Sequence, residues 1–428
     1  MVRPRQIRKF SLCVGLGLTL SSASLLFGED WPTFRGPNRT AVVDDSKLLK
    51  SWPEEGPKLL WEGSGAGRGY SSLAIVGNMM YTLGDGLSTQ KDADEYLSCF
   101  DKATGKQLWA TKTGSPWTSG KPDWQNSRST PTVDDGRVYV VTPEGQLVCC
   151  SATDGKVNWR KDFKKDFDGK KADGWGYSES VLVDGNKVIC TPGGATSTVV
   201  ALDKQSGETL WTCKNPDDRG AGHASVVITK LGNMKVYVQS TGSGLMGFSE
   251  SGSLLWTYPV DKTTAIIPTP VIRDDLVFFV AGYNRGGALV KQVSSANGSV
   301  AIKEVYGLNN KLSNKHGGVV LVGEHLYGDS DSSGIPYCAD FMTGTEKWKT
   351  RGSGKGSAVV IAGGDRLYIR FDNGIMALAE ASPAEYKELG SFKIPGSGER
   401  PSWSHPVILD GKLYLREQDN ILCYDIRG

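Results

Sequence analysis

Short apolar runs separated by turn residues follow one another along almost the whole chain. They are rich in Val, Ile, Leu, Tyr and Thr and are bounded by Gly, Asp, Asn and Ser, a pattern that predicts β-strands. One strand–turn–strand pattern occurs six times, as CFDKATGKQLW, CCSATDGKVNW, ALDKQSGETLW, MGFSESGSLLW, QVSSANGSVAI and CADFMTGTEKW. Its turn glycine recurs about every 48 residues from Gly105 to Gly344. That period is typical of propeller blades built from four short strands.

Each repeated position has a structural reason. The glycine supplies the positive φ of a tight turn, and Asp or Ser four residues before it can close that turn through a side-chain oxygen. The final position holds the residue type with the largest side chain to bury. We therefore predict that these tryptophans dock between blades: Trp61, Trp109, Trp159, Trp211, Trp256 and Trp348.

The last blade is predicted to be shared by the two ends of the chain. CYDIRG at residues 423–428 begins a copy of the pattern, and PKLLW at residues 57–61 supplies its missing second half. A further copy from Ala377 has Pro383 where the glycine belongs, so an irregular turn is expected there. We predict an all-β, eight-bladed β-propeller over residues 57–428, closed by N- and C-terminal strands in one blade. A seven-bladed ring is the alternative.

The N-terminal segment reads as an export signal. Four basic residues precede an apolar run from Phe10 to about Phe27, and small residues follow near a cleavage position. We predict a signal peptide over residues 1–28, with a membrane anchor as the alternative, and an arm over residues 29–56 that packs on the propeller. The protein is accordingly expected in the periplasm or outside the cell.

Composition narrows the class of partner. The chain has 49 Lys and Arg against 47 Asp and Glu, 54 glycines and 12 tryptophans. No basic patch predicts nucleic-acid binding, and no segment after the signal is apolar and long enough to cross a bilayer. Seven of the 8 cysteines follow the signal. Four of them take the first position of the repeated pattern, where a small buried apolar residue is expected: Cys99, Cys149, Cys338 and Cys423.

The pattern A-x-D-x-x-x-G-x-x-x-W, clearest at residues 201–211, resembles the tryptophan-docking motif of propellers with pyrroloquinoline-quinone (PQQ) repeats. The quinoprotein alcohol dehydrogenases and the non-catalytic scaffold lipoprotein of the outer-membrane barrel assembly machinery are similar in this way. The resemblance covers almost the whole chain after the signal. It implies the fold and leaves the activity open, because catalytic and non-catalytic relatives share the motif.

The loops that lead into the innermost strands are predicted to form a rim on one face of the ring. Aromatic, cationic, imidazole and carboxylate groups gather in that register: Tyr70, Arg128, Tyr177, Glu179, His223, His316, Lys355, Trp403 and His405. Such a mixture around one cavity suits a polar, flat or acidic small molecule. The alternative is that polar side chains at a wet channel mouth need no ligand.

Three functions remain open at this point. The favoured one is a non-catalytic binding scaffold in the cell envelope, with an envelope protein, a glycan or a small polar molecule as partner. The resemblance also allows a PQQ-dependent alcohol or polyol dehydrogenase, in which quinone and calcium lie on the axis and Glu179 binds the metal. For that enzyme we find no Asn and Asp partners, and the adjacent Cys149 and Cys150 are expected away from the axis. A hydrolase or lyase using a histidine and Glu179 ranks last, because no nucleophile is marked. No catalytic residue, cofactor or metal site is assigned.

Overall fold

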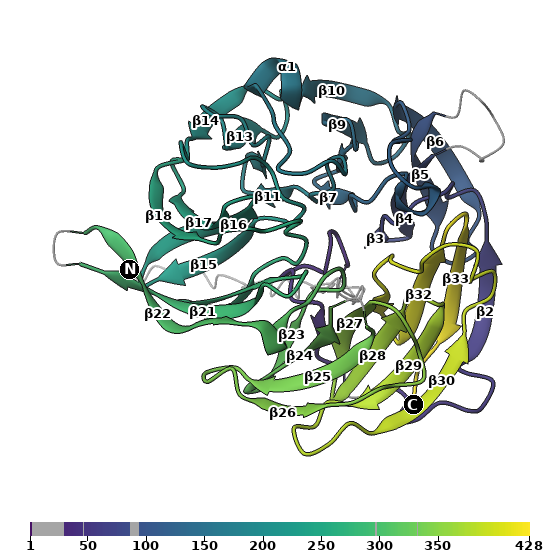
Figure 1. Ribbon diagram of the computed structural model, residues 1–428. Helices are drawn as coiled ribbons and strands as arrows, with labels where there is room; N and C mark the ends of the chain where they lie inside the picture. The colour runs from purple at the N-terminus through teal and green to yellow at the C-terminus, as the bar shows by residue number, and fades with distance from the viewer. Residues whose placement is uncertain (2–29, 46, 86–93, 296–297, 332) are drawn as a thin grey trace.

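Eight twisted sheets form a closed ring around a central axis (Figure 1). The computed structural model describes residues 1, 30–45, 47–85, 94–295, 298–331 and 333–428, so the predicted signal peptide lies outside the described residues except for Met1. Each sheet has four antiparallel strands, and one carries an additional short strand. The prediction of an all-β, eight-bladed propeller is confirmed, and the seven-bladed alternative is wrong.

In each blade the strands run from the axis outward. The innermost strands are β3 (Ala74–Val76), β7 (Thr132–Asp134), β11 (Leu182–Asp184), β15 (Val227–Leu231), β19 (Val271–Arg273), β23 (Val320–Val322), β27 (Ala358–Gly363) and β31 (Val407–Leu409). The second strands are β4 (Met79–Asp85), β8 (Arg137–Val141), β12 (Lys187–Cys190), β16 (Met234–Thr241), β20 (Leu276–Ala281), β24 (His325–Ser330), β28 (Arg366–Phe371) and β32 (Lys412–Glu417). The third strands are β5 (Glu95–Asp101), β9 (Gln146–Ser151), β13 (Val199–Asp203), β17 (Gly244–Ser249), β21 (Gly286–Ser294), β25 (Ile335–Asp340), β29 (Ile375–Glu380) and β33 (Asn420–Asp425). The outermost strands are β6 (Gln107–Gly114), β10 (Val157–Asp162), β14 (Thr209–Cys213), β18 (Leu254–Pro259), β22 (Val300–Asn309), β26 (Glu346–Lys349), β30 (Glu388–Lys393) and β2 (Lys58–Gly63).

Few elements lie outside the blades. Within the described residues they are the arm strand β1 (Val42–Val43), the helix α1 (Phe163–Phe167) and two 3₁₀ turns, Pro122–Trp124 and Asn310–Leu312. No helix among the described residues is long and apolar enough to span a membrane. The cysteines of residues 30–428 are all buried and unpaired.

The ring closes where the sequence predicted. The N-terminal β2 is antiparallel to the C-terminal β33, with Trp61 opposite Cys423. The eighth blade is therefore built from both ends of the chain, so the ring leaves no gap between its first and last strands.

The apolar core lies between neighbouring blades. Tyr81 and Leu97 of the first blade share one cluster with Val138 and Val148 of the second, and similar clusters follow around the ring. Each sheet is thus buried on both faces, and the contact from blade to blade is the main source of stability.

The structure explains why glycine and tryptophan recur together. The indole of each of four blades lies on the turn glycine of the next blade. A Cβ added to that glycine would lie 2.6 Å from Trp61 at Gly105, 2.6 Å from Trp109 at Gly155, 2.8 Å from Trp159 at Gly207 and 2.6 Å from Trp211 at Gly252. Glycine is therefore required twice, for its positive φ and for the space that its missing side chain leaves.

The remaining junctions use other contacts. Trp256 donates from Nε1 to Gln292 at 3.0 Å, and Trp348 donates from Nε1 to the Ser382 carbonyl at 2.8 Å. Where the fifth copy has isoleucine in place of tryptophan, Tyr306 packs on Gly344 instead. The turn that contains Pro383 joins β29, which ends at Glu380, to β30, which begins at Glu388, and so is longer than the five-residue turn between β13 and β14. The expected irregular turn is present.

Replacing Gly155 by alanine is expected to destabilise the protein more than replacing Gly136. Both glycines have φ +72°, so both variants incur a left-handed backbone cost of about 1–2 kcal/mol. Only at Gly155 does the new Cβ meet a neighbouring indole, because Gly136 faces open space. The overpacking should add roughly 1–3 kcal/mol. Urea unfolding followed by tryptophan fluorescence measures both, and equal losses would show that the indole contact adds nothing.

Candidate functional site

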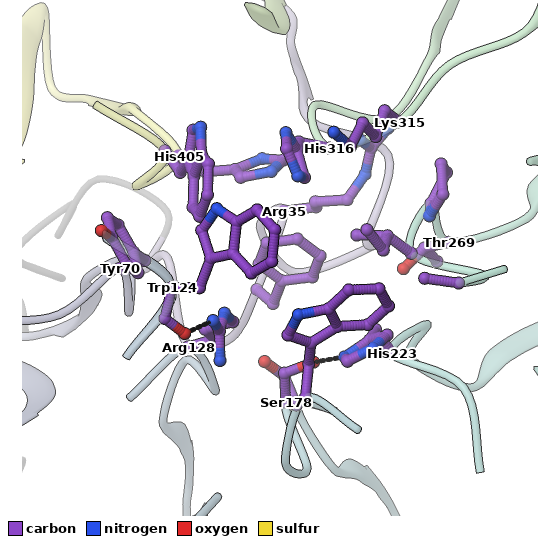
Figure 2. Close-up of a pocket in the computed structure, with 18 of the residues that line it drawn as sticks. Arg35, Tyr70, Trp124, Arg128, Ser178, His223, Thr269, Lys315, His316 and His405 are labelled. Carbon is purple, nitrogen blue, oxygen red and sulfur yellow. Dashed lines mark hydrogen bonds between the residues drawn. The ribbon is translucent and has the colours of Figure 1, made fainter. Parts of the chain in front are cut away.

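A pocket opens where the loops leading into the inner strands meet (Figure 2). It contains about 1030 Å³ of empty space, with the solvent at its mouth included. Its wall combines indoles, imidazoles and cations, among them Trp124, Trp175, His223, Arg128 and Lys315. None of the lining residues that the structure describes is Asp or Glu. The wall is therefore both aromatic and positively charged.

One register position builds most of this wall. In seven blades the residue four positions before the first residue of the inner strand lines the pocket, as Tyr70 does before Ala74. The full set is Tyr70, Arg128, Ser178, His223, Ile267, His316 and Trp403. Because side chains in extended backbone alternate with a period of two, Tyr177 and Glu179 on either side of Ser178 do not line the pocket.

Side-chain hydroxyls two residues further on hold this register between blades. The backbone N–H of Ser72 donates to Thr130 Oγ1 at 3.1 Å, and that of Thr130 donates to Ser180 Oγ at 2.9 Å. Ser180 N–H donates to Ser225 Oγ at 3.0 Å, and Ser225 N–H donates to Thr269 Oγ1 at 3.2 Å. Equivalent positions of successive blades therefore lie side by side, which places Arg128, Ser178 and His223 next to one another (Figure 2).

The structure brings six of the nine predicted rim residues to this pocket: Tyr70, Arg128, His223, His316, Trp403 and His405. Tyr177 and Glu179 flank Ser178 and point away from the pocket. Tyr177 packs edge-to-face on Phe163, with ring centroids 5.2 Å apart, and Lys355 is an exposed residue of a neighbouring loop. Tyr177, Glu179 and Lys355 are therefore not part of the pocket wall. Ligand binding by the other rim residues stays a prediction.

Glu179 is buried beneath the pocket, with 3% of its surface exposed. Its carboxylate accepts hydrogen bonds from Thr191 N at 2.7 Å, Thr191 Oγ1 at 3.0 Å and Gln239 Nε2 at 3.0 Å. Burial raises its pKa to about 7, against the bonds from Thr191 and the charge of Arg39, which lower it. The Glu179 carboxylate therefore has its hydrogen bonds within the protein, which indicates a structural role.

The N-terminal arm lies in the centre of the ring and forms the floor of the pocket (Figure 1). Trp31 exchanges backbone hydrogen bonds with Ile75 of the first blade, and β1 pairs with β27 of the seventh. Between them Arg39 donates to the carbonyls of Ser180 at 2.9 Å and Val226 at 3.2 Å. The arm therefore fills the channel.

Arg35 of the arm reaches the pocket floor. Its guanidinium donates to the carbonyl of Val319 at 2.7 Å, and only 4% of the residue is exposed. Its Nη1 has no hydrogen-bond partner among the described residues, and burial lowers its pKa to about 10, so the buried group stays charged at neutral pH.

Aromatic rings line the opposite side. Trp403 lies between Tyr70 and His316, at centroid distances of 4.7 and 4.4 Å, and donates from Nε1 to Asp372 at 2.6 Å. Burial lowers the pKa of His316 to about 3, so that imidazole is neutral. The positive charge of the pocket therefore comes from Arg35, Arg128 and Lys315.

The described residues do not fit a quinone with calcium on the axis. The arm occupies that space, and the carboxylate of Glu179 is already bonded to Thr191 and Gln239. No group of three His, Cys, Asp or Glu within the described part of the chain is arranged to hold a metal ion. Cys149 and Cys150 are unpaired on β9, the third strand of its blade. We derive no step through a quinone or calcium.

Sequence reasoning missed several lining residues. Ser178 lies four positions before the first residue of β11, as His223 does before β15, so the same count along the sequence identifies both residues. Trp124 ends the 3₁₀ turn Pro122–Trp124 and Trp175 lies on a loop, so neither follows the strand register, and Arg35 belongs to the arm.

Comparisons with known proteins agree with this architecture. A family model described as outer membrane protein assembly factor BamB matches residues 93–350. The BamB of Burkholderia pseudomallei is 25% identical over 218 residues, which cover 50% of this chain and 49% of that protein, so the match spans about half of its length. The crystal structure of BamB from Moraxella catarrhalis has a TM-score of 0.57 at 16% identity, covering 83% of this chain and 94% of that one. Quinohemoprotein alcohol dehydrogenase from Comamonas testosteroni has a TM-score of 0.62 at 13% identity, covering 94% and 81%. At these identities the two structures establish the fold alone.

Proposed function

Because the chain belongs to the family described as outer membrane protein assembly factor BamB, we propose that it is an exported, non-catalytic scaffold that binds envelope proteins during outer-membrane protein assembly. The family match carries the proposal, since it runs from the first blade to the last strand of the sixth. The expected export signal agrees with such a location.

The outer strands offer a surface for a protein partner. Leu108 on β6 and Leu210 on β14 are 51% and 45% exposed, and each precedes a docking tryptophan. These strands have an open edge, to which a partner can add a strand while the leucine provides apolar contact. Since the arm fills the channel, the outer strands and the rim are the surfaces left for binding.

Deleting the gene in the native host is expected to lower the amount of folded outer-membrane barrel protein, and the tagged full-length chain should co-purify with assembly proteins of the outer membrane. Heat-modifiability on gels and mass spectrometry of cross-linked envelopes measure the two effects.

The double variant Leu108→Asp, Leu210→Asp should weaken co-purification about tenfold or more, because each aspartate places a charge in an apolar contact. Met342→Asp is the control, since Met342 is also well exposed, at 40%, but lies in a turn outside the outer strands.

Two results would contradict the proposal. One is unchanged barrel folding in the deletion strain together with no co-purified assembly protein. The other is dye reduction by purified protein given PQQ, calcium and an alcohol, which would favour the dehydrogenase instead.

A further inference from the structure

Ser178 and His223 lie side by side on the pocket wall (Figure 2), and Asp173, which does not line the pocket, is bonded to His223. Ser178 Oγ is 2.6 Å from His223 Nδ1, and His223 Nε2 is 2.9 Å from Asp173 Oδ2. The His223 and Asp173 side chains are each 5% exposed, whereas Ser178 is partly exposed at the pocket wall. This is the order of contacts that activates a serine nucleophile: nucleophile to base, base to orienting carboxylate.

Backbone hydrogen bonds hold the two loops that carry these residues together. Ala221 N–H donates to the Lys170 carbonyl at 2.8 Å, and Ala172 N–H donates to the Ala221 carbonyl at 3.0 Å. His223 N–H donates to the Ile266 carbonyl at 2.7 Å. Asp173 is fixed in turn by the Trp175 N–H, which donates to its Oδ1 at 3.1 Å. The three side chains are therefore positioned before any ligand arrives.

The protonation states suit the arrangement. Although burial raises the pKa of Asp173, the hydrogen bond from His223, the charge of Lys171 and the hydrogen bond from the Trp175 N–H lower it to about 2, so the carboxylate is ionised. It accepts the Nε2–H, which leaves the lone pair of Nδ1 facing Ser178. Burial lowers the pKa of His223 to about 4, helped by the charges of Lys171 and Arg128 and opposed by Asp173. The imidazole is therefore neutral at pH 7 and can accept a proton.

Other hydroxyls at the same rim are used differently. Ser180 and Ser225 accept hydrogen bonds from backbone N–H groups of neighbouring blades. Ser178 Oγ has a histidine as its partner instead, and it lies beside Arg128. A purely structural hydroxyl at this position would not need a buried His–Asp pair behind it.

We propose that Ser178, His223 and Asp173 form a serine esterase site, with Ser178 as nucleophile, His223 as general base and Asp173 as the positioning residue. The proposal leaves the binding of envelope proteins unchanged, but it replaces the non-catalytic part of the scaffold proposal, because it adds a chemical activity to the pocket.

The reaction needs only the ester and water. Ser178 Oγ forms a bond to the ester carbonyl carbon while its proton passes to His223 Nδ1, and the bond to the leaving oxygen breaks as that oxygen takes the proton. Water then attacks the acyl-serine, gives its proton to Nδ1, and the carbon–Oγ bond breaks as Ser178 Oγ takes the proton back. The products are a carboxylic acid and an alcohol or phenol. Arg128 lines the same pocket and supplies positive charge for the oxyanion of both steps, although its guanidinium also bonds to the Trp124 carbonyl.

The pocket wall indicates the class of ester. Arg35, with its unpartnered Nη1, and Lys315 supply positive charge that no lining carboxylate neutralises, which favours a substrate with its own carboxylate. Trp124 and Trp175, 6.0 Å apart and perpendicular, offer surfaces for an aromatic ring. A weakly basic histidine also favours a good leaving group. Aryl esters that carry a carboxylate combine these properties.

Covalent labelling tests the nucleophile. A fluorophosphonate probe should modify the full-length protein at Ser178, as located by peptide mass spectrometry, and Ser178→Ala should not be labelled there. His223→Gln should slow labelling by roughly 10³-fold, while His325→Gln, which changes the histidine outside the pocket, should leave it unchanged. Labelling of the natural protein should fall as the pH drops through about 4, where His223 becomes protonated.

Turnover tests the substrate class and the role of Asp173. The protein should hydrolyse 4-nitrophenyl hydrogen succinate at least about tenfold faster than neutral 4-nitrophenyl butyrate, and Lys315→Met should reduce that preference. Asp173→Asn should lower kcat by roughly 10²–10⁴-fold and leave KM unchanged, with kcat calculated per folded molecule so that a loss of folding is not counted. Circular dichroism and the thermal midpoint confirm that each variant is folded.

The proposal is overturned if Ser178 is labelled no faster than the exposed turn residue Ser251, or if His223→Gln labels and hydrolyses like the natural protein. Ser178→Ala should still restore barrel folding in the deletion strain. Failure of the esterase test therefore leaves the binding of envelope proteins untouched. Likewise, failure of the barrel-folding and co-purification tests leaves the esterase proposal untouched.

Discussion

Replacing Arg416 by methionine is expected to lower the free energy of unfolding by roughly 3–5 kcal/mol. Arg416 lies on β32 of the eighth blade with 1% of its surface exposed. Its guanidinium donates to the carbonyls of Leu83 at 2.7 Å, Gly67 at 3.0 Å and Ser71 at 3.1 Å, all of which belong to the first blade or the loop before it. Methionine fills the space but leaves these buried oxygens without a donor.

Arg416 matters because it joins the last blade to the first. Arg370 of the seventh blade makes the preceding link, donating to the carbonyls of Ser404 and Arg416 at 2.7 Å each and to Glu417 at 2.8 Å. Lysine at 416 should recover less than half of the loss, because one ammonium group cannot reach carbonyls on several sides.

Urea unfolding of the natural protein and of Arg416→Met measures the change in the free energy of unfolding. Arg427→Met is the matched control, since the exposed Arg427 pairs with Asp425 two residues away, and this substitution should leave the stability almost unchanged. A loss at Arg416 within about 1 kcal/mol of this control would show that the junction does not depend on the guanidinium.

The sequence was sufficient for the ring because blade contacts repeat. At four junctions a turn glycine must accommodate an indole of the preceding blade, so the requirement occurs several times in the sequence, as at Gly105, Gly155 and Gly207. Closure was equally readable, since the half-pattern after Cys423 needs the half-pattern before Trp61. Where the junction uses Tyr306 in place of tryptophan, the pattern fails and only the structure shows the substitute.

The pocket was less readable because an extended chain changes face at each residue. His223 was placed correctly, but Glu179 was read in the same register as its neighbour Ser178 and points away from the pocket. An error of one residue therefore exchanged a candidate nucleophile for a buried carboxylate.

The arm and Asp173 could not be placed from the sequence. Arg39 bonds to carbonyls of Ser180 and Val226, and every residue has a carbonyl, so the acceptors carry no sequence signal. Asp173 meets His223 from an irregular loop fifty residues away, which only the packing of two blades brings close. In a chain of repeats, the features that serve function are those that the repeat does not specify.

Replacing Glu95 by glutamine is expected to make the protein more stable in alkaline solution. Glu95 is fully buried, and its carboxyl group bonds to Ser127 Oγ at 2.5 Å and Thr113 Oγ1 at 3.3 Å. Burial raises its pKa to about 8 from an ordinary 4.5, although both hydroxyls oppose the shift. Between those values the folded protein holds a proton that the unfolded chain has lost, so stability falls as the pH rises through this range.

Glutamine cannot ionise, so the variant should avoid that loss. At about pH 5 the two proteins should differ by less than about 1 kcal/mol, and at about pH 9 the variant should be more stable by roughly 3–5 kcal/mol. Urea unfolding at both pH values gives the difference, with Glu62→Gln on the exposed side of β2 as the control. Glu179 shares the sign of the effect and is present in both proteins, so it cancels in the comparison. Parallel pH dependence of the natural protein and Glu95→Gln would show that Glu95 ionises freely in the folded state.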